Sequence, residues 1–236
     1  KTTRTQLLPA LADGQSAFVF DAKWKSKQWT LFIPETEDEL PLPELAFVYG
    51  VSNADLLKKA LDAYRVIFND ASAALSNAGG GAFPDLKIQP PDTRKLKAGT
   101  MYYYPIPPFF DARVMPNGGL SDKVAVFSLS EKHTERILLP TPLKVDGGPL
   151  ADTKRNLGGA SYFNWAGCVD AATPWVMLGV HEAARQDGQG EKETAEIIKQ
   201  VKVVLDVLKC VESASSASYF EGKAYVTHTE LRIRDR

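Results

Sequence analysis

The sequence has few cysteines and histidines, almost no net charge, and no long hydrophobic run. Its two cysteines are too few for a disulfide-stabilised scaffold. Its net charge of −1 supplies no field that attracts nucleic acid or an anionic membrane. No apolar run approaches the roughly 18 residues of a membrane-spanning helix. We therefore expect a globular protein with no nucleic-acid partner and no transmembrane segment in this chain, and 236 residues are enough to bury a core.

The two cysteines, Cys168 and Cys210, each lie among apolar neighbours, in NWAGCVDA and DVLKCVES. Free cysteine is among the most buried residue types, so this context favours two buried thiols. A single disulfide between them is the alternative, and it would favour an oxidising compartment. Both interpretations stay open at this point.

Signatures of common catalytic sites are missing from the sequence. It contains no G-x-S-x-G elbow, no P-loop and no G-x-G-x-x-G fingerprint. The glycine-rich stretch at residues 78–83 leads into Phe-Pro-Asp and opens no helix, so it lacks the context of a phosphate site. We predict no cofactor and favour a protein that is not an enzyme.

The segment GVHEAAR, residues 179–185, differs from a zinc-protease signature at one position. In that signature two histidines four residues apart on a helix bind zinc, and a glutamate between them is the general base. Arg185 occupies the second ligand position here, and a guanidinium has no lone pair for a metal. We interpret His181 and Arg185 as a helix end whose cations complement the helix dipole.

The remaining histidines each begin an HTE tripeptide, at His133 and at His228. Strand periodicity places His228 in a charged, solvated row with Glu230 and Arg232. His133 falls in the first turn of a predicted helix, where we expect it to be exposed. The sequence therefore predicts no metal site.

Several segments have the apolar runs or the alternation of β-strands. They are Ser16–Trp24, Glu44–Ser52, Thr100–Pro108, Lys123–Ser130, a strand that runs into a helix within Gly158–Ala171, and two runs that flank Glu221-Gly222 as a hairpin. The segments between them are predicted as a tail (1–12), a solvated acidic loop (35–43), a long excursion (77–99) and a turn (116–122).

Helices are indicated by apolar stripes of helical period. One spans Ser52–Ser76 with Ser52 as its cap, one begins at Glu131, and one opens at Thr173-Pro174. The clearest is Glu191–Cys210. Its predicted buried stripe is Ile197, Ile198, Val201, Val204, Leu205 and Leu208.

Two stretches share one plan, LAFVYGVSNADLL and VAVFSLSEKHTERIL: an apolar strand, a serine at the junction, then a helix. This echo favours a duplicated strand–helix unit. The fold class we predict is α+β: a curved, largely antiparallel β-sheet with helices packed on one face and an internal pseudo-repeat. The domain is single, residues 1–236, and two related halves are expected at about 13–110 and 118–236.

Aromatic side chains are the feature that most favours a ligand. The candidate ligand-binding residues are Tyr102, Tyr103, Tyr104, Trp24 and Trp165. In a strand Tyr102 and Tyr104 point to one face and Tyr103 to the other. The simplest interpretation is core and sheet face, and the alternative is a platform or groove for a carbohydrate, a peptide or an apolar ligand.

Four stretches carry a resemblance: LPALADGQSAFVFDAKWKSKQW, LPLPELAFVYGVSNADLLKKALDAYR, NGGLSDKVAVFSLSEKHTERIL and SASYFEGKAYVTHTEL. Together they resemble a family of uncharacterised planctomycete bacterial proteins of unknown function. The resemblance covers most of the chain. It implies repeated strand–helix units and export, and it supplies no catalytic residues. The chain also begins at Lys1 without methionine, which favours a mature or trimmed chain.

These observations favour a non-catalytic, extracytoplasmic (periplasmic or secreted) binding or interaction module. Its partner would be a protein, a glycan or a small apolar ligand. One alternative is a carrier of an apolar ligand held between sheet and helices. Another is a hydrolase whose site is assembled from distant residues, with His181, Glu182 or His228 as acid or base.

Overall fold

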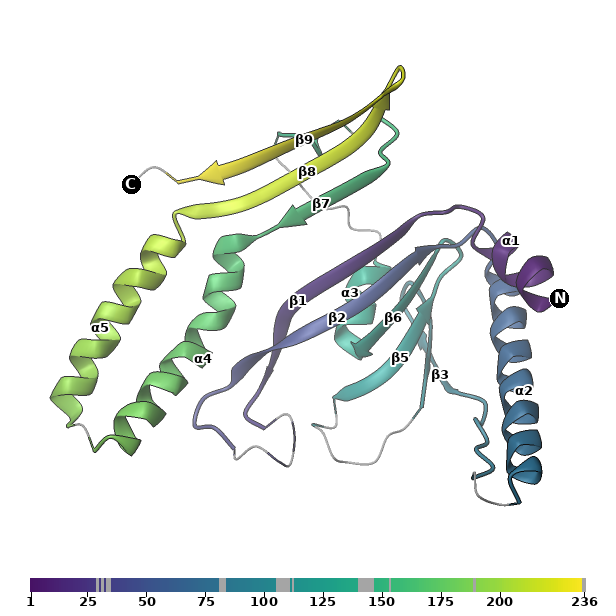
Figure 1. The fold of residues 1–236 in the computed structure, drawn as a ribbon, viewed down its shortest axis with the longest axis horizontal. Helices are drawn as coiled ribbons and strands as arrows, with labels where there is room; N and C mark the ends of the chain where they lie inside the picture. Colours follow the sequence, from purple (N-terminus) through teal and green to yellow (C-terminus); the bar gives the residue numbers. More distant parts are fainter. Residues whose placement is uncertain are drawn as a thin grey trace. The chain divides into compact units, whose positions relative to one another are not determined.

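The computed structural model has an α+β fold with antiparallel sheets, as predicted (Figure 1). The residues it describes are 1–28, 30, 32, 35–80, 84–104, 111, 113–139, 147–152, 154–188 and 190–234. The chain divides into two compact units. The first is Lys1–Glu37 with Leu42–Thr141, and the second is Asp38–Pro41 with Pro142–Arg236.

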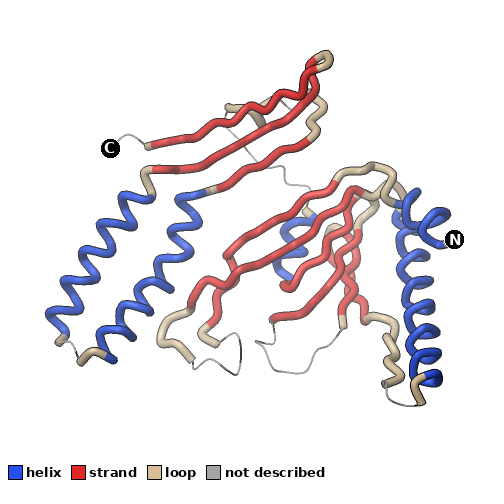
Figure 2. Tube along the Cα trace, in the orientation of Figure 1, coloured by secondary structure: helices blue, strands red, loops and turns tan. Residues whose placement is uncertain are grey.

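The first unit contains a sheet of six strands in the order β1-β2-β6-β5-β4-β3 (Figure 2). The strands are β1 (Ser16–Ser26), β2 (Leu40–Gly50), β3 (Asp92–Leu96), β4 (Gly99–Tyr103), β5 (Val114–Leu120) and β6 (Val124–Ser130). The helical elements of this unit are the π-helix η1 (Thr3–Leu7), α1 (Leu8–Ala10), α2 (Ala54–Ala78) and α3 (Glu131–Leu138).

The two faces of this sheet differ because side chains alternate along each strand. On β2, Ala46 is buried in a cluster with Val126 and with Leu138 of α3. The next residue, Phe47, points to the opposite face and pairs across the strands with Phe127. Small and β-branched residues therefore face α3, and large aromatic residues face the other way.

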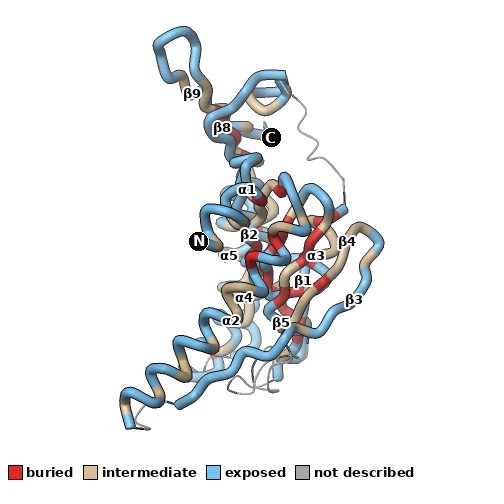
Figure 3. Tube along the Cα trace, turned by 90° about the vertical axis from the view of Figure 1, so that its right-hand side faces the viewer, coloured by how far each residue is buried: buried red, intermediate tan, exposed pale blue. Residues whose placement is uncertain are grey.

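Helices cover both faces of the six-stranded sheet. α3 lies on one face, and the second face carries another core, in which Ala10 and Leu57 pack on Leu120 and Ala125. This second core joins η1, α1 and the first turns of α2 to the end of the sheet. Buried residues are concentrated in the sheet and α3 of this unit, while α2 beyond its first turns is largely exposed (Figure 3).

The second unit has a three-stranded sheet in the order β7-β8-β9 and a helical hairpin. Its elements are β7 (Gly159–Phe163), α4 (Trp165–Gln186), α5 (Glu191–Leu208), β8 (Val211–Glu221) and β9 (Ala224–Ile233). The predicted hairpin about Glu221-Gly222 is confirmed, since Glu221 pairs with Ala224. The strands thus form two sheets, where one was expected.

Three segments that were predicted to be irregular are ordered. Residues 1–12, predicted as a tail, contain η1 and α1, and Ala10 is fully buried. The predicted acidic loop 35–43 ends in β2, whose first residues alternate Leu-Pro-Leu-Pro with both leucines buried. The predicted excursion 77–99 includes β3, an edge strand that keeps its charged side chains in solvent.

The predicted turn at 116–122 is also wrong, because Val114–Leu120 is the strand β5. Its glycines suggested a turn, but they are packing positions. A Cβ on Gly119 would overlap Thr134 and Leu138 of α3, and a Cβ on Gly118 would lie 3.6 Å from the Phe127 ring. Glycine here permits close approach of a helix and of an aromatic ring.

The helix boundaries differ from the predictions at two caps. Asn53, and not Ser52, caps α2 by accepting a hydrogen bond from the Leu56 N–H. Thr173-Pro174 does not open a helix, since α4 begins at Trp165 with Asn164 as its cap and contains Pro174. Ser130 caps α3. The predicted strand through Pro108 ends at Tyr103 as far as the structure describes it, and residues 105–108 lie outside the described part.

The predicted buried stripe of α5 is only half covered. Ile197, Ile198, Val201 and Leu205 are partly buried, but Val204 is 59% and Leu208 is 42% exposed. α4 packs along one side of α5 and the strand β8 follows its end, so this unit covers one side of the helix. Among the described residues, no helix is long and apolar enough to cross a membrane.

Candidate functional site

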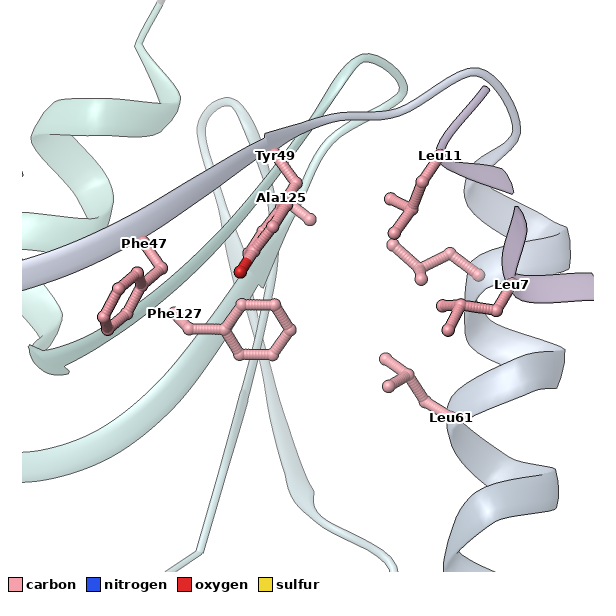
Figure 4. A pocket seen from close by; sticks show the side chains of 8 residues that line it. Leu7, Leu11, Phe47, Tyr49, Leu61, Ala125 and Phe127 are labelled. Carbon is pink, nitrogen blue, oxygen red and sulfur yellow. The ribbon is translucent and has the colours of Figure 1, made fainter. Parts of the chain in front are cut away.

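An open groove lies in the first unit between its N-terminal helices and the aromatic face of the sheet (Figure 4). Its volume is about 330 Å³, at the small end of the range for small-molecule sites. It is lined by Leu7, Leu11, Phe47, Tyr49, Leu57, Leu61, Ala125 and Phe127. None of these side chains is charged, and the Tyr49 hydroxyl is their one polar group.

The sheet side of the groove is built by strand alternation. Phe47 and Tyr49 are two residues apart on β2, and Phe127 lies across from Phe47 on β6. The Tyr49 and Phe127 rings meet edge to face, with centroids 6.2 Å apart. Phe47 is 53% and Phe127 is 41% exposed, although both stand on central strands. The wall is thus aromatic, ordered and accessible.

The helix side of the groove is aliphatic. Leu57 and Leu61 are four residues apart on α2, which places them on one face of the helix. Leu7 and Leu11 come from η1 and from the residue that ends α1, and they meet the leucines of α2 across the groove from the rings (Figure 4). A hydrogen bond of 2.6 Å between the hydroxyls of Thr3 and Tyr64 fixes η1 on α2.

None of the three predicted ligand-binding tyrosines is among the residues that line this groove. Tyr102 on β4 packs against the core that contains Leu57. Tyr103 lies on the opposite face, in register with Asn117. Tyr104 follows the end of β4 and is 40% exposed. Tyr102 and Tyr103 therefore lie on opposite faces, as the alternation predicted.

Trp24 lies in the first unit and Trp165 in the second. The Arg113 guanidinium lies 5.8 Å from the centroid of the Trp24 ring. Arg113 also bonds Asp111 and thereby holds the pKa of that carboxyl well below its ordinary value. Trp165 donates its indole N–H to the Leu208 carbonyl at 2.9 Å. Both tryptophans have structural contacts in the part of the chain that the structure describes.

The groove residues themselves were missed by the sequence analysis. Leu7 and Leu11 fall in the predicted tail, and Phe47 falls within the predicted strand Glu44–Ser52, to which no binding role was given. A signal was present in the alternation of size in ELAFVYG, where alanine and valine alternate with leucine, phenylalanine and tyrosine. Large apolar residues on one face of a central strand indicate that something apolar covers that face.

A buried polar layer lies on the other face of the sheet, against α3. His133, predicted to be exposed, is 1% exposed. Neither ring nitrogen has a hydrogen-bond partner among the described residues. Burial lowers the pKa of His133, and the nearby Glu44 carboxylate opposes this effect. The prediction failed because α3 turns its first-turn histidine toward the sheet.

Glu44 is the anion of this buried layer. Its side chain is fully buried, and its Oε2 accepts hydrogen bonds from the Arg136 guanidinium at 2.6 Å and from the backbone N–H of Trp24 at 3.1 Å. Asp21 lies 3.3 Å from Arg136. Beside them, the Thr134 hydroxyl donates to Asn117 Oδ1. The layer joins α3 to the sheet, and none of its members lines the groove. We therefore assign it a structural role.

The residues of the hydrolase alternative lie in the second unit. His181 and Arg185 line a groove of about 450 Å³ with Glu191 and Thr194. The Thr194 hydroxyl donates to the Gly190 carbonyl, and among the described residues it forms no hydrogen bond with a base. Glu182 is paired with Arg185 at 2.6 Å, and His228 is exposed on β9. The segment HEAAR thus ends a helix with a surface ion pair.

Cys168 and Cys210 are free thiols, and the expectation that both are buried is wrong because Cys168 is exposed. Among the described residues, no group of three or more His, Cys, Asp or Glu side chains could hold a metal ion. Comparisons with protein-family models, with curated proteins and with solved structures gave no match.

Proposed function

We propose that this protein is a binding module whose ligand is apolar and occupies the groove between the N-terminal helices and the six-stranded sheet. The observation that carries the proposal is the exposure of Phe47 and Phe127 toward the leucines of η1 and α2. Soluble proteins rarely leave ordered aromatic and aliphatic side chains facing each other across open space unless a partner fills it.

The site supports binding more than chemistry. Its eight lining residues contain no titratable side chain other than Tyr49, and they include no nucleophile with an adjacent base. Burial of apolar surface therefore supplies the binding energy. This is the carrier form of the binding-module hypothesis, with the ligand held between sheet and helices.

A neutral fluorescent probe, N-phenyl-1-naphthylamine, tests the proposal. We expect its fluorescence to rise on the wild-type chain in a saturable manner. Phe47→Ser and Phe127→Ser should each weaken its binding about fivefold, since each removes roughly half the transfer free energy of a phenyl group. Both residues are exposed, so the variants should stay folded.

Phe220→Ser is the matched control, because Phe220 is 73% exposed on β8 of the second unit. This variant should bind the probe as the wild type does. Equal binding by all four proteins, or no saturable signal with the wild type, would refute the proposal.

We also propose an extracytoplasmic location for this module, supported by the resemblance of its sequence to an exported family. Cell fractionation of the source organism with an antibody to the chain tests this. Recovery with cytoplasmic markers alone would contradict it.

A further inference from the structure

Arg65 continues the line of residues that forms the helix side of the groove. Leu57, Leu61 and Arg65 are spaced by four residues, so they share one face of α2. Leu57 and Leu61 line the groove. Eight residues of α-helix span about 12 Å, so a cation stands about 12 Å along the helix from Leu57 and one turn beyond Leu61.

The guanidinium of Arg65 has unused hydrogen-bonding capacity. Its side chain is 24% exposed, and its Nε is buried without a hydrogen-bond partner among the described residues. Its Nη2 lies 3.7 Å from Asp62 Oδ1, which is too far for a hydrogen bond. The side chain is partly exposed, so the guanidinium can still donate hydrogen bonds to a ligand.

A second buried polar atom without a partner among the described residues lies on η1, the other helical element on this side of the groove. Gln6 lies on η1 directly before the groove residue Leu7, and its Oε1 has no hydrogen-bond partner among the described residues. An amide can turn to present its NH₂ group, so Gln6 can serve as a donor as well as an acceptor. Both helical elements that border the groove thus carry a polar group that nothing described satisfies.

We infer that the ligand is an amphiphile with one carboxylate and a medium-length apolar tail. This inference rests on the proposed function and adds the charge and the class of the ligand. The tail lies between the leucines and the aromatic rings, and the carboxylate accepts hydrogen bonds from Arg65. Arginine binds a carboxylate through parallel N–H donors, and the partly exposed guanidinium of Arg65 supplies them.

Charge complementarity selects this occupant. The groove residues are uncharged, and the Arg65 guanidinium has one ion pair among the described residues, with the exposed Asp62 and beyond hydrogen-bond distance. A neutral lipid would gain no charge-assisted hydrogen bond from this guanidinium, and a cationic amphiphile would be repelled. The volume of about 330 Å³ and the 12 Å span favour a short chain over a long one.

Displacement of N-phenyl-1-naphthylamine by decanoate and by decanol tests the inference. These probes share a ten-carbon chain and differ in charge. We expect decanoate to bind the wild-type chain about tenfold or more tightly than decanol, as is usual for a hydrogen bond to a charged group. Shortening the carboxylate chain should weaken binding by up to about fourfold per methylene.

Arg65→Gln should bring decanoate to the affinity of decanol and leave decanol binding unchanged, and Arg65→Lys should keep part of the difference. Lys59→Gln is the control, because Lys59 is exposed and points away from the line of Leu57 and Leu61. The wild-type comparison of decanoate with decanol still decides the question if Arg65→Gln fails to fold.

The outcomes separate the two proposals. Equal binding of decanoate and decanol would overturn the inference and leave the apolar groove intact. Tighter binding of decanoate that survives Arg65→Gln would also overturn it, since the carboxylate would then be held elsewhere. Failure of both compounds and of the neutral probe would overturn the proposed function itself.

Discussion

The Nη2 of Arg136 lies 2.6 Å from the Oε2 of Glu44, and this ion pair ties α3 to β2. Glu44 is fully buried while Arg136 remains one-third exposed. A buried carboxylate costs much more without its partner than the pair contributes together. The pair therefore determines where α3 sits on the sheet.

Removal of Arg136 should leave the buried Glu44 carboxylate without its ion-pair partner. We expect Arg136→Met to lower the free energy of unfolding by about 3 kcal/mol, at the low end for a broken buried pair because the arginine is partly exposed. Glu44→Met combined with Arg136→Met should recover most of this loss. Urea denaturation measures both values. Arg185→Met, which breaks the surface pair with Glu182, should cost under about 1 kcal/mol.

His133 should make stability depend on pH. Burial lowers its pKa in the folded state, so below the ordinary pKa of 6.5 the unfolded chain binds the proton first. Its contribution to stability is therefore fully present above pH 6.5 and is lost as the pH falls toward the lowered pKa of the folded state. Thermal melts of the wild type and His133→Leu across this range should diverge, with the variant less sensitive to acid.

Exposed histidines provide the control for this pH effect. His228→Gln should retain the pH dependence of the wild type, since His228 is exposed on β9. If His133→Leu and the wild type lost stability in parallel as the pH fell, the buried histidine would not be the titrating group.

Two adjacent glycines of β5 should respond differently to a methyl group. Gly119→Ala forces a Cβ into Thr134 and Leu138, and we expect it to cost about 1–3 kcal/mol of stability. Gly118→Ala places its Cβ 3.6 Å from the Phe127 ring, an ordinary contact. It should be neutral or slightly stabilising. Similar losses for both variants would mean that α3 does not pack on Gly119 as described.

Asn69 should control the segment that runs along α2. Its amide accepts a hydrogen bond from the Ile88 N–H at 2.8 Å and donates to the Ile88 carbonyl at 3.1 Å. Asn69→Ala should speed amide hydrogen exchange at Ile88 about fivefold, as expected for the loss of about 1 kcal/mol. Asn77→Ala on the same helix should leave this rate unchanged.

Elements with strong local signals were predictable from the sequence. The alternation about Glu221-Gly222 predicted the β8–β9 hairpin, and the helix predicted to begin at Glu131 is confirmed as α3. These features depend on neighbours a few residues away. The α+β class and the antiparallel sheet follow from such signals because period and turn chemistry act locally.

The groove and the buried layer depend on contacts between distant residues. Leu7 meets Leu61, and Glu44 meets Arg136, across separations that no local pattern encodes. His133 illustrates the limit, because a histidine in a first helical turn is usually solvated and only the docking of α3 buries it. The same holds for Gly118 and Gly119. Their sequence suggests a turn, but they lie in a strand because Phe127 packs on Gly118 and α3 packs on Gly119.

The exposure of Phe47 and Phe127 has an evolutionary consequence. The two rings are partly exposed, so mutation at these positions is under weaker selection for stability than mutation of a fully buried aromatic residue. If the proposed ligand exists, drift to polar residues in descendants that lose it, and retention of aromatic residues in those that keep it, would make these two codons a record of the protein's use.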